Sequence, residues 1–195
     1  VQRFMEQFLQ QLLNGLAVGG MYALVALGYT MVYGVLKLIN FAHGDLFTIG
    51  AYLGLTLLVS CNFSGMLSPM LAVLAVFVMV ALLVAIIGFL LERTAYRPLR
   101  NANRLSAVVS ALGASIFFQN AIMLIYGARF YVYPDYLRPD FTVHLFGLAV
   151  PGVRLLVIAA SVILMLGLWA FIQRSRTGAA IRAVAIDPGA AQLMG

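Results

Sequence analysis

The chain has 195 residues, of which 64% are hydrophobic and 9% are charged. A soluble domain carries about 25% charged residues, so this composition excludes an ordinary soluble domain and predicts an integral membrane protein. The net charge of +6 comes from basic residues grouped between apolar segments, a pattern that indicates membrane topology and not binding to nucleic acid.

Five apolar segments follow one another along the chain, and each is expected to form a membrane-spanning helix. Together they predict an all-α, polytopic helix bundle. Between the last two segments, over residues 129–154, we expect a mixed loop, because Pro134, Pro139 and Pro151 argue against a continuous helix. The five segments cover residues 12–34, 46–60, 66–91, 105–127 and 155–173.

The second segment is the shortest, and a polar patch at residues 38–46 precedes it. Its 15 residues extend about 22 Å as a helix, whereas a bilayer core of about 30 Å needs about 20 residues. To span, it must recruit either the patch or residues 61–63. Recruiting the patch places His43 and Asp45 about one turn inside the membrane, where ionisable side chains usually face protein or water. The candidates for lining a translocation path are therefore Asn40, His43, Gly44 and Asp45.

An ordinary helix start would also account for this patch. In that interpretation Asn40 caps the second helix, and Asp45 lies in its first turn, where the helix dipole favours an anion. Both features are common where helices begin, so both interpretations remain open at this point.

The fourth segment carries two amides in its outer half, Gln119 and Asn120. Buried amides need partners, and they either join helices or contact a solute. Helix–helix bonding is the commoner outcome, and both residues remain candidates for the translocation path. Small residues four positions apart let helices approach closely, and they occur as Gly15 with Gly19, Gly50 with Gly54, and a ridge of Ala107, Ala111 and Ser115.

Basic residues predict the orientation of the chain. An arginine-rich stretch is expected to be a cytoplasmic loop, and its members are Arg93, Arg97, Arg100 and Arg104. Together with Lys37 and the arginines of residues 174–182 they give eight basic residues on one side, against four on the other. The positive-inside rule makes the first side cytoplasmic. With five spans, the N-terminus is then outside and residue 195 is cytoplasmic.

The last segment, residues 178–195, is rich in small residues and differs from the spans. It predicts a short helix over 179–186, a turn at 187–189 and a second short helix from residue 190. Asp187 is placed to cap the second helix. Small residues let a helix lie closely in a groove of another protein, so the segment is either a docking site for a soluble partner or a connecting loop.

Several motifs occur together and in order along the whole chain. They lie at residues 14–16, 22–24, 28–34, 39–45 (Ile-Asn-Phe-Ala-His-Gly-Asp), 92–100 (Glu-Arg-Thr-Ala-Tyr-Arg-Pro-Leu-Arg) and 174–178 (Arg-Ser-Arg-Thr-Gly), followed by Arg182, Asp187, Ala190, Ala191 and Gly195. With these motifs the chain resembles the permease subunits of bacterial branched-chain amino-acid ABC transporters, the high-affinity type that takes up leucine, isoleucine and valine.

The resemblance implies a multi-pass protein of the bacterial inner membrane that pairs with a second, homologous permease subunit. Two ABC ATPase subunits would dock from the cytoplasm, and a periplasmic binding protein would deliver the amino acid. Residues 1–195 would be the N-terminal part of one permease domain of about eight spans. Residues 178–195 would couple the permease to its ATPase, with the candidate residues Gly178, Arg182, Asp187, Ala190, Ala191 and Gly195.

The chain carries no motif for hydrolysing ATP by itself. A phosphate-binding loop requires Gly-Lys-Ser/Thr, and Lys37, the only lysine, has no glycine before it. The spans contain neither paired carboxylates nor a nucleophile with a base, and Cys61 alone forms no cysteine-based metal site. We therefore expect a transport subunit, not an enzyme, with no metal and no cofactor.

Two other transport functions compete with this interpretation. A related importer would carry other amino acids, urea or short amides. A secondary transporter or channel would need acids within the membrane for ion coupling, and only Asp45 qualifies. That second alternative leaves the segment at 178–195 without a role.

Overall fold

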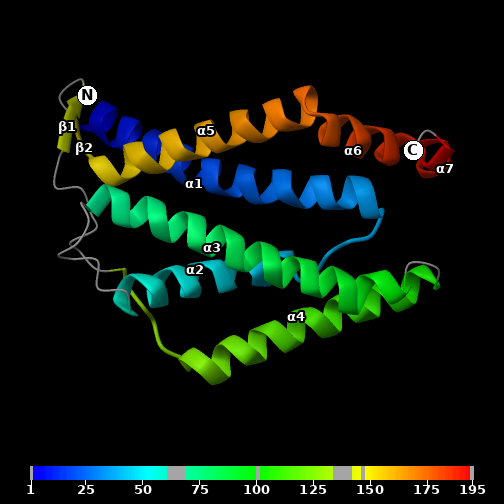
Figure 1. The fold of residues 1–195 in the computed structure, drawn as a ribbon. Coiled ribbons are helices and arrows are strands. Elements are labelled where there is room, and N and C mark those ends of the chain that lie inside the picture. The colour runs from blue at the N-terminus through cyan, green and yellow to red at the C-terminus, as the bar shows by residue number, and fades with distance from the viewer. Residues whose placement is uncertain (1, 61–68, 100–101, 134–141, 146–147, 194–195) are drawn as a thin grey trace. The chain divides into compact units, whose positions relative to one another are not determined.

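The computed structural model describes residues 2–60, 69–99, 102–133, 142–145 and 148–193 (Figure 1). The described chain is almost entirely helical and divides into two units. The first unit comprises Val1–Lys37 and Arg138–Gly195, and the second comprises Leu38–Leu137. The boundary at Lys37 falls directly before the polar patch, which therefore begins the second unit.

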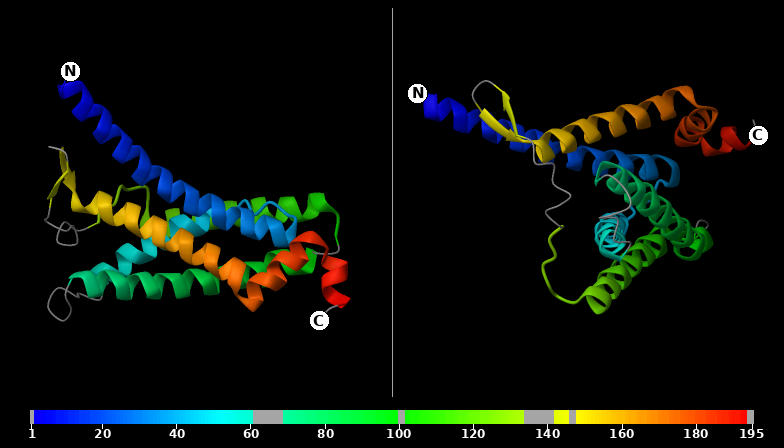
Figure 2. Two further views of the ribbon diagram at one scale, coloured as in Figure 1. Left: turned by 90° about the horizontal axis from the view of Figure 1, so that it is seen from above. Right: turned by 60° about the vertical axis from the view of Figure 1, so that its left-hand side comes forward.

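Two long helices that lie side by side form the body of the first unit (Figure 1). They are α1 (Gln2–Leu36) and α5 (Gly152–Arg174). Gly20 on α1 lies against Ser161 on α5, and Ser161 is buried. From the end of α5 the chain continues into two short helices, α6 (Arg176–Ile186) and α7 (Pro188–Leu193) (Figure 2).

A short antiparallel hairpin precedes α5. Strand β1 (Thr142–Leu145) pairs with β2 (Leu148–Pro151), with Val143 opposite Val150. The sequence predicts a mixed loop without a continuous helix here, and the structure adds that part of this loop is a two-stranded hairpin. β-Branched residues favour extended strands, and Pro151 is tolerated because it is the last residue of an edge strand.

The described residues of the second unit form three α-helices, and α2 contacts both of the others (Figure 2). They are α2 (His43–Ser60), α3 (Pro69–Leu91) and α4 (Arg104–Tyr126). α3 continues into a π-helical turn, η2 (Glu92–Tyr96), and a 3-10 turn, η3 (Arg97–Leu99). A small buried core joins these elements and consists of Ala42, Leu91, Tyr96 and Ala111.

Small residues place α2 antiparallel to α3. A Cβ built at Gly50 would contact Val84 and Val80, and one built at Gly54 would contact Val80. This pair therefore lies at a helix contact, as the sequence predicts. The other pair does not, because a Cβ at Gly15 or Gly19 would meet none of the described atoms within 4 Å.

Tyrosines hold the far end of α2. The Tyr126 hydroxyl shares a 2.7 Å hydrogen bond with Thr56 Oγ1, and its ring lies 4.5 Å from that of Tyr52. The Tyr133 hydroxyl donates to the Ala51 carbonyl at 2.7 Å. Burial raises the pKa of Tyr133 above its ordinary value, because the charged phenolate is disfavoured away from water.

Among the described residues, four helices are long and apolar enough to cross a membrane: Phe4–Leu36, Leu71–Leu99, Leu105–Tyr126 and Gly152–Arg174. The all-α, polytopic fold is thus confirmed, with four such spans where the sequence predicts five. The remaining helix, α2, has only 18 residues, and two of them are His43 and Asp45. These two side chains lower its mean hydropathy below that of the four spans.

The arginine-rich stretch after the third segment is predicted to be a loop, but its first residues, Glu92 to Leu99, are still helical. Helical turns continue through η2 and η3, so Arg93 and Arg97 lie on helical backbone with exposed side chains. A long basic side chain can extend from a helix into water, and the helical hydrogen bonds meet no proline before Pro98. Arg104 begins α4, and Arg100 lies outside the described residues.

We predict that Gly20→Leu weakens the packing of α1 on α5. A Cβ at Gly20 would lie 3.0 Å from Ser161 Cβ, so a leucine would force the two helices apart at a cost of about 1–3 kcal/mol. Thermal unfolding in detergent should show the lower midpoint. Gly15→Leu is the matched control on the same helix, and equal destabilisation by the two variants would contradict the predicted contact.

Candidate functional site

The polar patch forms a break between two helices. α1 ends at Leu36 and α2 begins at His43. Within the break, the Asn40 carbonyl accepts a hydrogen bond from the His43 amide at 3.2 Å, and Asn40 Oδ1 accepts one from the Tyr96 hydroxyl at 2.6 Å. The side-chain oxygen that the capping interpretation assigned to α2 is thus bonded to η2 instead, so Asn40 ties the break to the end of α3.

Asp45 lies in the first turn of α2, as predicted, and it is buried. The Ser115 hydroxyl on α4 donates to Asp45 Oδ2 at 2.5 Å. Gln119 Nε2 in turn donates to Ser115 Oγ at 3.0 Å. A buried polar group is costly unless it has a hydrogen-bond partner, and Ser115 supplies one to Asp45. Asp45 therefore joins the start of α2 to the middle of α4.

The structure brings only some of the predicted path residues together. Gln119 is linked to Asp45 through Ser115, whereas Asn120 donates to the Ile116 carbonyl of its own helix at 2.7 Å. His43 is half-buried beside the break, and Gly44 is exposed. Sequence reasoning recognised Ser115 only as a small residue in a packing ridge, because its hydroxyl gains significance only once Asp45 is known to face it.

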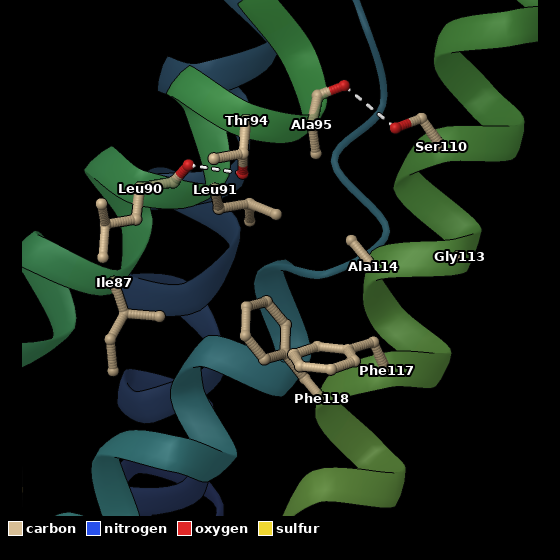
Figure 3. Close-up of a pocket in the computed structure, with 10 residues that line it drawn as sticks. All are labelled: Ile87, Leu90, Leu91, Thr94, Ala95, Ser110, Gly113, Ala114, Phe117 and Phe118. Atoms are coloured by element: carbon tan, nitrogen blue, oxygen red, sulfur yellow. Dashed lines mark hydrogen bonds between the residues drawn. The ribbon is translucent and has the colours of Figure 1, made fainter.

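A cavity of about 460 Å³ lies between the end of α3 and α4 (Figure 3). Its two hydroxyls are already engaged. Thr94 Oγ1 donates to the Leu90 carbonyl at 2.7 Å, and Ser110 Oγ donates to the Ala95 carbonyl at 2.9 Å. The rest of the lining is apolar and includes Ile87, Leu91, Phe117 and Phe118.

This cavity suits an apolar group. None of the described residues that line it is charged. An amino acid carries an ammonium and a carboxylate, and burying either without a partner costs free energy. The cavity can therefore hold an apolar side chain or an acyl chain, but its described lining does not satisfy both charged ends of an amino acid. None of the path residues predicted from the sequence lines it.

The start of α6 is folded tightly onto the end of α5. Ser175 Oγ accepts a hydrogen bond from the Gly178 amide at 2.8 Å, which caps the helix. A Cβ at Gly178 would overlap the carbonyl oxygens of Ile172 and Phe171, so only glycine fits there. Arg182 Nη1 donates to the same Ile172 carbonyl. Two of the predicted coupling residues, Gly178 and Arg182, thus fix α6 to α5.

The junction between α6 and α7 is a capped turn. Asp187 Oδ1 accepts hydrogen bonds from the amides of Gly189 at 2.8 Å and Ala190 at 3.1 Å, which confirms that Asp187 caps the second short helix. Ala190 and Ala191 lie on α7, and Gly195 lies outside the described residues. Ile186, the last residue of α6, is 87% exposed, so this turn presents a large apolar side chain to its surroundings.

A protein family described as "Branched-chain amino acid transport system / permease component" matches residues 11–195. The chain belongs to this permease family. The high-affinity branched-chain amino acid transport system permease protein BraD of Pseudomonas aeruginosa is 41% identical over 191 residues, which is 96% of this chain. The corresponding LivH proteins of Escherichia coli and Salmonella typhimurium are each 39% identical over the same share.

These permease relatives are longer than the chain described here. The matches cover 62% of each relative, so the chain spans less than two thirds of their length. No solved structure matches the chain. The family membership confirms the resemblance drawn from the sequence motifs.

We predict that Ser115→Ala destabilises this permease family member more than Ser110→Ala does. The first change removes a hydrogen bond to the buried carboxylate of Asp45, worth about 1.5–3 kcal/mol, whereas the second removes a bond to a neutral carbonyl, worth about 0.5–1.5 kcal/mol. Both serines lie on α4, so they form a matched pair. Unfolding midpoints in detergent provide the comparison, and a larger loss in Ser110→Ala would show that Ser115 does not hold Asp45.

We also predict that Gly178→Ala displaces α6 from α5. The added methyl group would clash with two backbone carbonyls, which cannot rotate away as a side chain can, and we expect a loss of about 1–3 kcal/mol. Gly167→Ala on α5 is the control, because its methyl group would meet nothing within 4 Å. Limited proteolysis should cleave the α6–α7 segment faster in Gly178→Ala alone, and unchanged cleavage would refute the close contact.

Proposed function

We propose that the chain is a membrane-spanning permease subunit of an ATP-driven importer for branched-chain amino acids. The family match over residues 11–195 carries this proposal, and the names of BraD and LivH supply the substrate class. The chain lacks a phosphate-binding loop, so the energy would come from two ABC ATPase subunits. A second homologous permease and a periplasmic binding protein would complete the importer.

In this proposal the α6–α7 segment is the docking site for the ATPase. Its helices are capped and held on α5 by Gly178 and Arg182, so a force applied to them would reach a long helix. The exposed Ile186 is the type of apolar side chain that a partner protein would cover. Asp187, Ala190 and Ala191 form the turn and short helix beside it.

The break before α2 would contribute polar groups to the translocation path. A branched-chain amino acid needs a mostly apolar path with a few polar groups for its charged ends, and broken helices supply such groups in transporters. The proposed residues are Asn40, His43, Gly44, Asp45, Gln119 and Asn120. The network from Asp45 to Gln119 supports this assignment for the residues near the break.

The proposed orientation places the ends of α1 and α6 in the cytoplasm and the N-terminus outside, in the bacterial inner membrane. Within the first unit, Lys37 Nζ donates to the Ala185 carbonyl, which puts Lys37 beside the last turn of α6. Within the second unit, Asn40 and Tyr96 are bonded, and α2 runs antiparallel to α3. Both observations agree with grouping the eight basic residues on one side, and α2 would then supply the fifth pass.

We predict that Ile186→Asp abolishes binding of the ATPase. In cells that express the importer genes together, the affinity-purified permease should retain its ATPase subunits, whereas this variant should lose them at least tenfold, because an unpaired carboxylate buried in an interface costs about 3–5 kcal/mol. Ala149→Asp, an exposed residue of β2, should retain them. ATPase retained in full by Ile186→Asp would exclude docking at this turn.

Uptake assays in the same cells distinguish the proposed importer from a secondary transporter and from importers of related substrates. Uptake of labelled leucine should require ATPase activity and persist when ionophores remove ion gradients, whereas a secondary transporter would fail under the ionophore. Unlabelled isoleucine and valine should compete with leucine. Competition by urea or short amides, without competition by valine, would favour the related importers instead.

A further inference from the structure

Lys37 ends α1 in an unusual backbone conformation. Its φ is +54°, and among the described residues it is the only non-glycine residue with positive φ. Its amide donates to the Tyr33 carbonyl at 2.8 Å, which closes the last turn of the helix. Glycine usually occupies this position, since a Cβ is disfavoured in the left-handed region. A lysine here therefore carries a conformational cost that glycine would not.

The side chain of Lys37 caps a second helix. Lys37 Nζ donates to the Ala185 carbonyl at 2.6 Å. Ala185 lies in the last turn of α6, where carbonyls lack partners within the helix and the helix dipole favours a cation. The chain has no other lysine. One residue thus ends α1 with its backbone and α6 with its side chain, although the two bonded residues are 148 positions apart.

The α6 helix is consequently held at two places on the first unit. Arg182 binds it to α5, from which it directly follows in sequence. Lys37 binds it to α1. The residue after Lys37 is Leu38, the first residue of the second unit, and the break that contains Asn40 follows at once. Any displacement of Ala185 that Lys37 follows is therefore applied to the backbone at the start of the break.

We propose that Lys37 is a positioning residue that transmits movement of α6 to the polar break before α2. This rests on the proposed function, because the movement is the one that a docked ATPase would impose. The amide of Lys37 is bonded to Tyr33 and its exposed side chain to Ala185, so this one residue connects the end of α1 to the end of α6. Asn40 and Asp45, which follow in the break and in α2, would move with it.

The test uses the complete importer in membranes and compares three changes at one position. Lys37→Met removes the ammonium and keeps the length of the side chain, Lys37→Arg keeps a cationic donor, and Lys37→Gly removes both the ammonium and the backbone strain. Uptake of labelled leucine per assembled complex should fall about tenfold in Lys37→Met and Lys37→Gly, the factor that a charge-assisted hydrogen bond can supply. Lys37→Arg should restore most of the uptake.

ATPase binding and ATP hydrolysis should stay near wild type in all three variants, because Lys37 acts after docking. Arg174→Met, which removes an exposed cation at the end of α5, is the control for net charge and should leave uptake unchanged. Wild-type uptake in Lys37→Met, full uptake in Lys37→Gly, or loss of bound ATPase in Lys37→Met would each overturn the proposal. Absence of ATPase from the wild-type complex would instead reject the proposed function.

A distance measurement follows the transmission directly. Spin labels at Tyr33→Cys and Ala183→Cys, both exposed positions, report the separation of α1 and α6 in a Cys61→Ala background. With Lys37 present, the distance should be the same with and without bound nucleotide, because the two helix ends move together. In Lys37→Met it should change with nucleotide. If the distance responds to nucleotide in the same way in both proteins, whether it changes or stays constant, the role of Lys37 is overturned.

Discussion

The hydrogen bond from Ser115 to the buried carboxylate of Asp45 is the contact on which the second unit depends. A carboxylate can be buried in an apolar bundle only where a donor reaches it. The donor here is a short side chain, so α2 must approach α4 closely. That approach is possible because Ala107 and Ala111 lie on the same ridge and are both buried. The buried acid of α2 therefore requires small residues on α4, because only they let the two helices come close enough for Ser115 to reach it.

The chain between α1 and α2 is not helical, but bonded or buried residues recur along it. Lys37 at its start is bonded to α6, Asn40 within it to η2, and Asp45 just beyond it to α4. Ala42 is fully buried in the core. Loops are usually the most mobile segments of a protein, but this one has a bonded or buried residue every few positions.

The sequence predicted the spans α4 and α5 closely, but it did not predict where the helical backbone after α3 ends. Long apolar runs identify spans from composition alone, and α4 and α5 begin and end within three residues of the predicted segments. The arginines after α3 indicated where the chain meets water, but helical hydrogen bonds persist past that point to Leu99. The sequence did not predict the hairpin before α5, because the argument there rested on the prolines, whereas the valines of this segment favour strands.

The residues of the site were predicted by type, but their partners could not be. Asp45 stands out as an acid in apolar sequence, and Asp187 as a cap before a small-residue helix. By contrast, Tyr96, Ser115 and Ala185 matter only because the fold places them beside Asn40, Asp45 and Lys37. These pairs are separated by 56, 70 and 148 positions, so no local pattern records them. From the sequence alone, Lys37 counts only as one of the basic residues that predict the membrane orientation.

The cavity and the polar network occupy neighbouring faces of α4. Ser110 and Ala114 line the cavity, whereas Ala111 and Ser115, one position further along, face α2 and η2. Successive residues of a helix point about 100° apart, so a rotation of α4 would move both surfaces at once. The cavity supplies apolar surface without charged described residues, and the network supplies polar groups. Among the described helices, α4 thus carries both the apolar lining of the cavity and the polar network.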